Sequence, residues 1–419
     1  MPKLQFFQTL QSEINRIDDA KVTKRNERII EGFTMGKNPK AIVEGKEYAI
    51  FNSNDYLGLR HLPQIKEAEH QASQAYGAGP GAVRFISGSL KVHLDLEKAL
   101  AKFHGRDDAM IFSSAFATNM AVLFSLAKGQ NKDSLLSGNT LIISDELNHR
   151  SIIDGVRVAG LSSEQKTIFP HMQPTAVGKI LDDNAGKFDR VIVVTDGVFS
   201  MLGEYQDLKT LSEVCTAHDS QYAEGVLLIV DDAHGVAALG NTGRGTEESS
   251  GGKADVLIGT MGKGFGADGG YVVADQVTIN YLRESAATYI YSNSISPGTA
   301  GAALASVQLV DSPEGTQLMS HLAKLIIHFK ASMTTKGFNF AADSTHPIQP
   351  LLIGDAQKAQ AFMHGMFAEG FITTSINYPV VPKGKDEIRV QLNAQQSVEE
   401  LDQFATAAVK VAKTVGLFK

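Results

Sequence analysis

Between residues 107 and 274, short apolar runs alternate with segments of helical periodicity. The runs, in chain order, are AMIFSS, TLIIS, RVIVVTDGV, VLLIVDDAHG, DVLIGTMGKG and GGYVVA, and segments such as ATNMAVLFSLA and LKTLSEVCTAH separate them. Short β-branched runs bounded by polar or glycine turns and separated by helices are typical of a parallel sheet that helices cover on both faces. The chain is therefore predicted to be an α/β protein.

The pattern changes on either side of this region. Apolar positions recur at helical spacing in the stretch FFQTLQSEINRI, so we expect an amphipathic helical arm over residues 4–34. The segment PGTAGAALASVQLV predicts a linking helix, and the strands and helices that follow it predict a smaller α+β domain. The expected domains are an arm over 1–50, a large domain over 51–300 and a small C-terminal domain over 301–419.

Composition disfavours several classes of function. The chain has 419 residues, a formal charge of −7 and no run of basic residues, so neither a nucleic-acid surface nor a polybasic membrane anchor is expected. Its single cysteine, Cys215, rules out an intramolecular disulfide and a cysteine-cluster metal site, and we predict no metal. No apolar run reaches the roughly 18 residues of a membrane span, and the first residues lack the features of a signal peptide. We therefore expect a cytoplasmic protein whose partners are small molecules.

Polar residues follow four of the apolar runs, at the point where each run ends. They fall within residues 145–149, 196–200, 231–234 and 260–263. Because ligands bind at the carboxyl edge of open α/β sheets, one site could collect all four groups. The arrangement indicates a ligand site at that edge.

Two of these stretches carry groups suited to a flat heteroaromatic ring. A carboxylate of VDDAHG could hold a pyridinium nitrogen protonated, while the histidine three residues on hydrogen-bonds a ring oxygen. The alternative for VDDAHG is a helix cap with a surface histidine. In DELNHRS, His149 could stack on such a ring or simply pack in a turn. Neither stretch alone distinguishes a ligand site from a structural turn.

The stretch GTMGKGFG places Lys263 among glycines directly after a predicted buried strand. Glycine removes the side chains that would keep a phosphate or an aldehyde away from the lysine amine. The pattern differs from the phosphate-binding loop of nucleotide hydrolases, because Gly264 stands where that loop requires serine or threonine. Lys263 is therefore a candidate for contact with an aldehyde or a phosphate.

Two further stretches could bind anions. SSAFATNM joins a strand to a helix through small residues, so free backbone amides at the start of the helix could hold a phosphate; the alternative is an ordinary βα turn. In DEIRVQL, the guanidinium group of Arg389 could hold a substrate carboxylate; the alternative is a surface ion pair with Glu387 or Asp386. No stretch is decisive alone, but their joint occurrence in this order is.

The chain resembles the α-oxoamine synthases, which are pyridoxal-phosphate enzymes of fold type I. The stretches that carry the resemblance span about residues 50–395 and are NSNDYLGL, GAVRFISGSLKVHLDLEKALA, DELNHRSIIDGVR, TDGVFSMLGEYQDL, VDDAHGVAALGNTGRG, GTMGKGFGADGG, YIYSNSISP and YPVVPKGKDEIRVQL. The resemblance implies an aminotransferase-like fold, a homodimer with shared active sites, and pyridoxal 5'-phosphate as cofactor. It also implies condensation of a small amino acid with an acyl thioester.

The resemblance further implies roles around the cofactor ring. Lys263 would bind the cofactor aldehyde covalently and later move the substrate proton. Asp231 would pair with the pyridine nitrogen, and His149 would stack over the ring. His234 and Ser200 would reach the phenolic oxygen of the cofactor.

For the cofactor phosphate, the resemblance implies contacts from two chains. Backbone at Ala115 and Phe116, together with Thr260, would hold the phosphate within one subunit. Ser294, in the YSNS segment, would reach the phosphate of the neighbouring subunit.

For the substrates, the resemblance implies that Asn54 and Arg389 bind the carboxylate of the amino acid. YPVVPKG, RFISG and FSSAF are similar to 2-amino-3-ketobutyrate coenzyme A ligase, which joins glycine to acetyl-CoA. SNDYLGL, GKGFG and YIYS are similar to 8-amino-7-oxononanoate synthase, which uses alanine and a long acyl thioester. We therefore expect glycine, alanine or serine as the donor, acyl-CoA or an acyl carrier protein as the acyl source, and release of coenzyme A and usually carbon dioxide. The alternatives are that ligase proper, or an aminotransferase or decarboxylase that uses no thioester.

Overall fold

The computed structural model describes residues 2–19, 23–25, 27–378 and 380–418. The chain divides into two compact units, residues 1–49 and 50–419. In the first unit, α1 (Pro2–Asp19) is followed by the strands β1 (Gly32–Phe33), β2 (Ala41–Val43) and β3 (Lys46–Ile50), and β2 pairs antiparallel with β1 and β3. The prediction of a helix over residues 4–34 is therefore wrong in its length. The end of that segment belongs to a sheet, because Gly32 and Phe33 pair with β2.

The second unit is built around a seven-stranded sheet with the order β4-β10-β9-β8-β7-β5-β6. β10 runs antiparallel to both of its neighbours, and the other strand pairs are parallel. The strands are β4 (Asp108–Phe112), β5 (Thr140–Asp145), β6 (Lys166–Phe169), β7 (Arg190–Asp196), β8 (Val226–Asp231), β9 (Val256–Thr260) and β10 (Gly270–Ala274). This mostly parallel sheet confirms the predicted α/β class, although the sequence patterns predict neither β6 nor the direction of β10.

Apolar side chains fill the centre of this sheet. Every residue of β7 is buried, including the run from Val191 to Val194. A parallel strand with helices on both faces is apolar at successive positions rather than at alternate ones. Each fully buried valine or isoleucine contributes about 1.5–3 kcal/mol. The central strands therefore form a rigid platform that holds their carboxyl ends in place.

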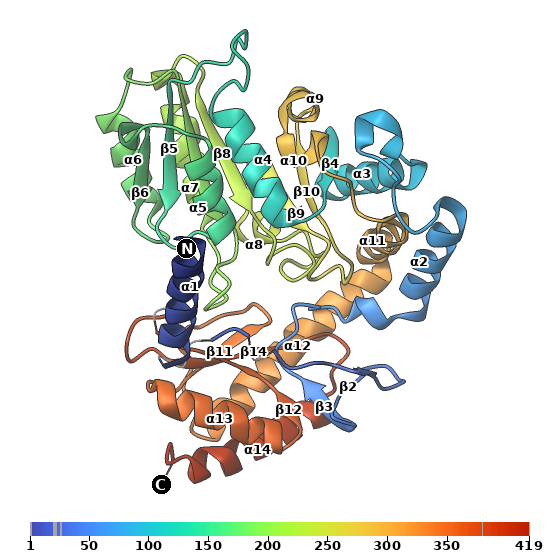
Figure 1. Cartoon of the computed structure of the whole chain (residues 1–419). Helices are drawn as coiled ribbons and strands as arrows, with labels where there is room; N and C mark the ends of the chain where they lie inside the picture. The colour runs from blue at the N-terminus through green and yellow to red at the C-terminus, as the bar shows by residue number, and fades with distance from the viewer. Residues whose placement is uncertain (1, 20–22, 26, 379, 419) are drawn as a thin grey trace. The chain divides into compact units, whose positions relative to one another are not determined.

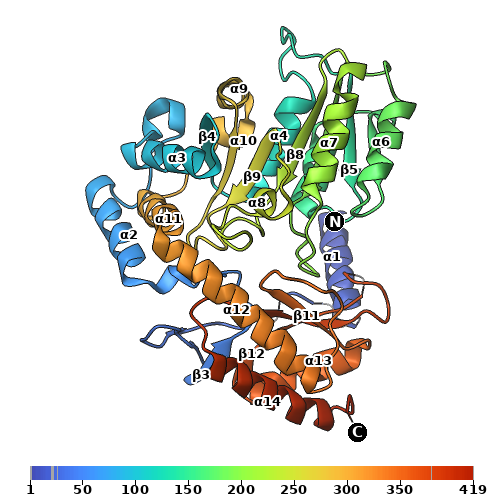
Figure 2. The ribbon, with the colours of Figure 1, turned by 180° about the vertical axis from the view of Figure 1, so that it is seen from behind.

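Helices cover both faces of the sheet. α4 (Ala115–Ala127) lies in front of it in Figure 1, and α7 (Leu208–His218) lies in front of it in the reverse view of Figure 2. Each begins at a side-chain cap: Ser114 Oγ accepts from the amide of Ala117 at 3.1 Å, and Asp207 Oδ1 accepts from that of Thr210 at 3.1 Å. The other helices up to residue 310 are α2 (Pro63–Tyr76), α3 (Lys91–His104), α5 (Arg150–Val158), α6 (Pro174–Asp183), α8 (Thr246–Ser250), α9 (Gln276–Ser285), α10 (Ala287–Ile290) and α11 (Pro297–Val310).

The C-terminal part of the second unit has a different architecture. The long helix α12 (Pro313–Thr335) follows α11 and runs diagonally in Figure 2. The antiparallel sheet β11-β14-β13 consists of β11 (Ile348–Leu352), β13 (Thr374–Ile376) and β14 (Glu387–Gln391), and the remaining elements are α13 (Ala356–Ala368), β12 (Phe371–Ile372) and α14 (Val398–Thr414). These elements confirm the predicted α+β composition, and the domain limits at 50 and 300 stay predictions. Within the described residues, no helix is long and apolar enough to cross a membrane.

Strand register brings the polar ends of the central strands together. Asp196, the last residue of β7, is paired in register with Asp231, the last residue of β8. β9 lies on the other side of β8 and ends at Thr260. The carboxyl edge of the sheet therefore collects the segments that the sequence marks as a ligand site.

Candidate active site

A cavity lies at the carboxyl edge of the sheet. Its lining comes from the starts of α4 and α5 and from the segments at the ends of β7, β8 and β9: Ala115, Phe116, His149, Ser151, Asp196, Val198, Ser200, Asp231, Ala233, His234 and Lys263. Every residue expected to act on the cofactor ring is in this lining, and so are the two residues whose backbone is expected to hold the phosphate. The structure thus brings these groups together, while their individual roles stay predictions.

Asp231 is held in place by two hydrogen-bond donors. Nδ2 of Asn119 lies 2.5 Å from Oδ2 of Asp231, and the amide of Ala233 donates to Oδ1 at 3.0 Å. Asn119 is fully buried, and its Nδ2 also donates to Ser151 Oγ at 2.9 Å. These two hydrogen bonds fix the position of the carboxylate, which suits a group that faces a ring nitrogen.

His149 caps the start of α5. Its Nδ1 lies 2.7 Å from Ser151 Oγ, and its backbone amide donates to Asp196 Oδ2 at 3.0 Å. Burial lowers the pKa of His149, and the charge of Lys263 adds to this lowering while Asp231 opposes it. The imidazole is therefore neutral and fixed at both its ring and its backbone, which suits stacking on a flat ring.

His234 is held by two buried aromatic side chains. Its Nδ1 lies 2.7 Å from the hydroxyl of Tyr56, and its carbonyl oxygen lies 2.7 Å from Nε2 of His346. The rings of Tyr56 and His346 meet edge to face with centroids 4.9 Å apart, and both residues are fully buried. Burial lowers the pKa of His234 well below its ordinary value, so this imidazole is neutral as well.

Lys263 lies in a loop that packs closely on its neighbours. Burial lowers the pKa of Lys263 from 10.5 to about 8, because desolvation outweighs the attraction of Asp231 and Asp196. A Cβ at Gly264 would lie 2.5 Å from the carbonyl oxygen of Ala237, so that glycine is needed for close packing on the loop after β8. The lysine is thus partly deprotonated near neutral pH and firmly placed.

The start of α4 offers backbone amides for an anion. The first amides of a helix have no intrahelical partner. Oγ of Ser114 accepts from the amide of Ala117 at 3.1 Å, and its carbonyl oxygen accepts from the amide of Thr118 at 3.0 Å. The amides of Ala115 and Phe116 take no part in these bonds to Ser114. This is the backbone predicted to bind the phosphate, and a helix start favours negative charge there.

Thr260 and Ser294 lie outside the cavity lining. Thr260 Oγ1 donates to the carbonyl of Gly269 at 2.9 Å and accepts from the amide of Gly262 at 3.1 Å. Ser294 Oγ is buried and has no hydrogen-bond partner within the described part of the chain. The structure of one chain therefore does not bring these two predicted phosphate ligands into the cavity.

Asn54 and Arg389 also lie outside the lining. Asn54 Oδ1 accepts from Gln391 Nε2 at 2.6 Å. Nε and Nη2 of Arg389 are buried and, among the residues described, have no hydrogen-bond partner. Burial is the main cause that lowers the pKa of His234 and that of Lys263, and the charge of Arg389 lowers both further. The guanidinium group therefore lies near the cavity. Buried and unpaired nitrogens do not fit the alternative of a surface ion pair.

Several residues that shape the site do not stand out in the sequence. Tyr56, Asn119 and His346 each contact a predicted residue, yet none of them adjoins that residue in the chain. A buried asparagine inside an apolar helical segment was the one available signal for Asn119. Asp232, the second carboxylate of VDDAHG, accepts from the hydroxyl of Thr246 at 2.5 Å and from its amide at 2.8 Å. These bonds tie the segment after β8 to the start of α8.

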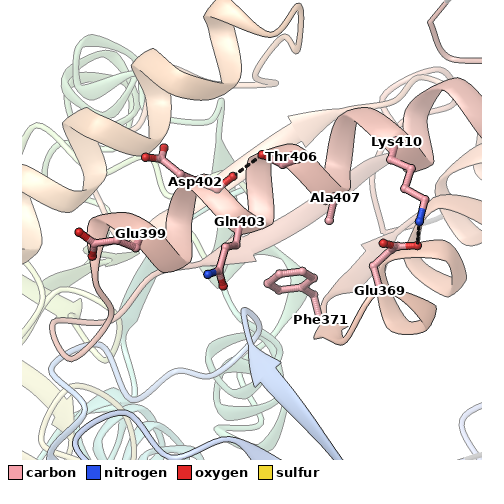
Figure 3. Close-up of a pocket in the computed structure, with 8 residues that line it drawn as sticks. All are labelled: Glu369, Phe371, Glu399, Asp402, Gln403, Thr406, Ala407 and Lys410. Carbon is pink, nitrogen blue, oxygen red and sulfur yellow. Dashed lines mark hydrogen bonds and ion pairs between the residues drawn. The ribbon is translucent and has the colours of Figure 1, made fainter.

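A separate groove lies on the C-terminal part of the chain (Figure 3). It is lined by Glu369, Phe371, Glu399, Asp402, Gln403, Thr406, Ala407 and Lys410. Lys410 Nζ pairs there with Glu369 Oε1 at 2.8 Å. None of the predicted site residues lines this groove, so it is not the candidate active site. No group of histidine, cysteine, aspartate or glutamate side chains in the described ranges could hold a metal ion.

The cavity has the groups that pyridoxal 5'-phosphate requires. A hydrogen-bonded carboxylate suits its pyridine nitrogen, the first amides of a helix suit its phosphate, and a lysine with a lowered pKa suits its aldehyde. The neutral imidazole of His149 lines the same cavity. The fold and the site define a pyridoxal-phosphate enzyme of fold type I.

Known proteins narrow this class to a family. The model of the family aminotransferase class I and II matches residues 46–407. An 8-amino-7-oxononanoate synthase of Treponema denticola is 36% identical over 381 residues, which cover 90% of this chain and 91% of that protein. The mitochondrial 2-amino-3-ketobutyrate coenzyme A ligase of Bos taurus is 36% identical over 412 residues, 97% of this chain and 92% of that protein. A solved serine palmitoyltransferase with pyridoxal phosphate shares the fold, with a TM-score of 0.87, 23% identity and 99% of each chain covered.

The chain belongs to the aminotransferase class I and II family and, within it, to the α-oxoamine synthases. The resemblance carried by the sequence stretches is confirmed, and so is the aminotransferase-like fold. α-Oxoamine synthases use pyridoxal phosphate to condense an amino acid with an acyl thioester. The protein is therefore a pyridoxal-phosphate-dependent C-acyltransferase.

Proposed function

We propose that the protein condenses glycine, alanine or serine with an acyl-CoA thioester to an α-amino ketone, releasing coenzyme A and usually carbon dioxide. The observation that carries the proposal is that Lys263, with a pKa lowered to about 8, shares one cavity with Asp231, His149 and His234. A lysine amine must lose its proton to act as a nucleophile or to accept a proton, and burial in this cavity favours that form.

Each group of the cavity has a defined task in this proposal. When bound, pyridoxal phosphate supplies an electron sink for negative charge at the α-carbon of the amino acid. Asp231, held in place by its two donors, would pair with the protonated pyridine nitrogen. His149 covers the ring, while His234 and Ser200 orient it through its phenolic oxygen. Lys263 Nζ holds the cofactor and then accepts the α-proton of the amino acid.

Asn54 and Arg389 bind the amino-acid carboxylate in this proposal. Nε and Nη2 of Arg389, buried and without a partner among the described residues, support this role, because a guanidinium fork matches the two oxygens of a carboxylate. Asn54 is tied to the same strand through Gln391. Together they would set the orientation of the α-carbon toward Lys263.

We further propose a homodimer with shared active sites. Phe85, Ile86 and Tyr291 are 66%, 65% and 80% exposed in the single chain. Tyr291 directly follows α10, which contacts residues 84–88. Exposed apolar side chains that lie close together are typical of a surface that a partner covers. Ser294, close to Tyr291 in the chain, has a buried hydroxyl without a partner among the described residues. The proposal also includes the predicted phosphate contact from Ser294, with Thr260, in the dimer. A cytoplasmic location is part of the proposal, and the free, buried Cys215 is compatible with it.

A second candidate is 2-amino-3-ketobutyrate coenzyme A ligase activity, with glycine and acetyl-CoA as substrates. The ligase of Bos taurus, which matches 97% of this chain, favours it. The 8-amino-7-oxononanoate synthases match with the same identity and favour a longer acyl chain and alanine. The donor and the acyl chain therefore have to be decided by experiment.

The experiment is an assay of free thiol release from acyl-CoA by the purified protein with pyridoxal phosphate. Glycine, L-alanine and L-serine are each combined with a short and a long acyl-CoA, and the visible spectrum is recorded with each amino acid before the thioester is added. We expect one amino acid to change the spectrum and one thioester to release thiol only in its presence. Spectral change without thiol release from any thioester, including an acyl carrier protein, would instead indicate an aminotransferase or a decarboxylase.

A further inference from the structure

Glu387 and Arg389 lie two residues apart in β14, so their side chains leave the same face of the strand. Glu387 is fully buried, and neither of its carboxyl oxygens has a hydrogen-bond partner within the described part of the chain. Two nitrogens of Arg389 are in the same condition. A buried polar group without a partner costs free energy, so two of them side by side indicate a missing ligand.

The face of β14 that carries Glu387 and Arg389 also carries the contact to Asn54, the other predicted ligand of the amino-acid carboxylate. Gln391, the next residue on this face, donates to Asn54, and the charge of Arg389 reaches Lys263 in the cavity. The strand neighbours opposite Glu387 are Leu352 and Ile376, which carry no charge. The charged groups that act on Glu387 are Arg389 and Glu204, the latter from the segment after β7.

These surroundings keep the carboxyl of Glu387 uncharged. Burial raises the pKa of Glu387 from 4.5 to about 8, although the charge of Arg389 opposes the rise. An uncharged carboxyl has one O–H donor, and the guanidinium group of Arg389 has N–H donors beside it. A carboxylate carries two acceptor oxygens close together, so it can accept from both groups at once.

We propose that Glu387 is a specificity-determining residue of the amino-acid site and donates a hydrogen bond to the donor carboxylate that Arg389 binds. The inference rests on the proposed function, because the carboxylate of the amino acid is its ligand. Arg389 supplies the charge, and Glu387 supplies a second donor without adding charge. When Glu387 loses its proton at high pH, it pairs with Arg389 and repels the carboxylate, so the donor binds only as Glu387 regains that proton.

The test compares three variants of the holoenzyme with the wild type. Glu387→Gln keeps a donor but cannot ionise, Glu387→Leu removes the donor, and Glu369→Gln makes the same chemical change in the groove of Figure 3. The dissociation constant of the amino acid is measured by calorimetry from pH 6.5 to 9.5, in buffers of different ionisation enthalpy, so that proton uptake on binding is measured too. Circular dichroism confirms that each variant is folded.

We expect the wild type and Glu369→Gln to bind the donor about tenfold more weakly for each pH unit above about 8, and to take up roughly one additional proton per site on binding there. Glu387→Gln should bind like the wild type at pH 7 and lack both effects. Glu387→Leu should bind about tenfold more weakly at pH 7, the loss of one hydrogen bond to a charged group. Its kcat should change less than its KM.

Two results would overturn the inference. If Glu387→Gln shows the same proton uptake and pH dependence as the wild type, Glu387 does not protonate on binding. If Glu387→Leu binds the donor like the wild type at pH 7, the carboxylate site stands without Glu387. Failure of the proposed function looks different, because then no amino acid would bind to the wild-type holoenzyme, and both proposals would fall.

Discussion

The hydroxyl of Tyr56 lies 2.7 Å from Nδ1 of His234, although the two residues are 178 positions apart in the chain. Tyr56 is fully buried, and burial raises the pKa of its hydroxyl, so the phenol keeps its proton. The hydroxyl also lies 3.3 Å from Oδ1 of Asn54, a second acceptor for that proton. When the phenol donates to Nδ1, the neutral ring of His234 carries its own proton on Nε2. This tautomer is the one that can donate a hydrogen bond to a phenolate oxygen of the cofactor.

Tyr56→Phe should therefore weaken catalysis, because no hydroxyl would then fix the ring proton of His234 on Nε2. We expect kcat/KM to fall about tenfold and the free energy of unfolding to fall by about 1 kcal/mol, because one buried hydrogen bond is lost. Turnover and chemical denaturation measure the two effects. Tyr222→Phe is the matched control: its buried hydroxyl donates to the carbonyl of Leu181 at 2.6 Å, away from the cavity, so stability alone should change. Equal activities of the two variants would contradict the role of Tyr56.

Lys263→Ala should abolish turnover and leave the fold intact. The ammonium form of Lys263 is disfavoured by burial, as its pKa of about 8 shows, so removing the amine should not lower the free energy of unfolding by more than about 1 kcal/mol. Lys253→Ala, which changes an exposed lysine in the segment before β9, serves as the control and should keep its activity. A normal rate in the Lys263 variant would remove its catalytic role.

His171 should make stability depend on pH. Burial lowers the pKa of His171, but the hydrogen bond to Asp145 at 3.0 Å and the ion pair with Glu204 at 3.5 Å outweigh burial and raise the pKa from 6.5 to about 9. A group with a raised pKa stabilises the fold fully below its unfolded value and loses that contribution as pH rises through its folded value. We expect a loss on the order of 1–3 kcal/mol between pH 6.5 and 9.

Denaturation of the wild type and of His171→Gln across this range measures that contribution. The stability difference between the two proteins should be largest near pH 6 and should shrink toward pH 9. A difference that does not change with pH would show that His171 stays neutral in the fold.

Gly264→Ala should displace the loop that carries Lys263. The added Cβ would lie 2.5 Å from the carbonyl oxygen of Ala237, so we expect a loss of about 1–3 kcal/mol in stability together with lower turnover. At Gly262, an added Cβ would meet nothing closer than 3.4 Å, so Gly262→Ala should have a smaller effect on both quantities. Thermal unfolding and turnover of the pair check the difference, and an equal effect would show that packing on Ala237 is not the cause.

Local sequence patterns were sufficient for the central part of the fold. Successive apolar residues in β7 and β8 predict strands buried on both faces, and Asp196 and Asp231 at their ends predict the functional edge. The predicted length of the N-terminal helix was wrong, because the pairing of Gly32 and Phe33 with β2 depends on residues farther along the chain. The antiparallel direction of β10 could not be predicted for the same reason. A buried apolar strand has the same residue pattern whether it pairs parallel or antiparallel with its neighbours.

The chemistry of the site divides in the same way. The residue types and their order in the chain were enough to identify Lys263 and Asp231 and to indicate a pyridoxal-phosphate enzyme, because each follows a strand whose end must reach one edge of the sheet. The partners of these groups come from distant segments: Asn119 contacts Asp231 from α4, and Tyr56 contacts His234 from before α2. Glu387 also becomes buried, with no hydrogen-bond partner among the residues that the structure describes, only when β14 is packed. A side chain's neighbours and its exposure to water depend on how separate elements pack, and no local pattern of residues records that packing.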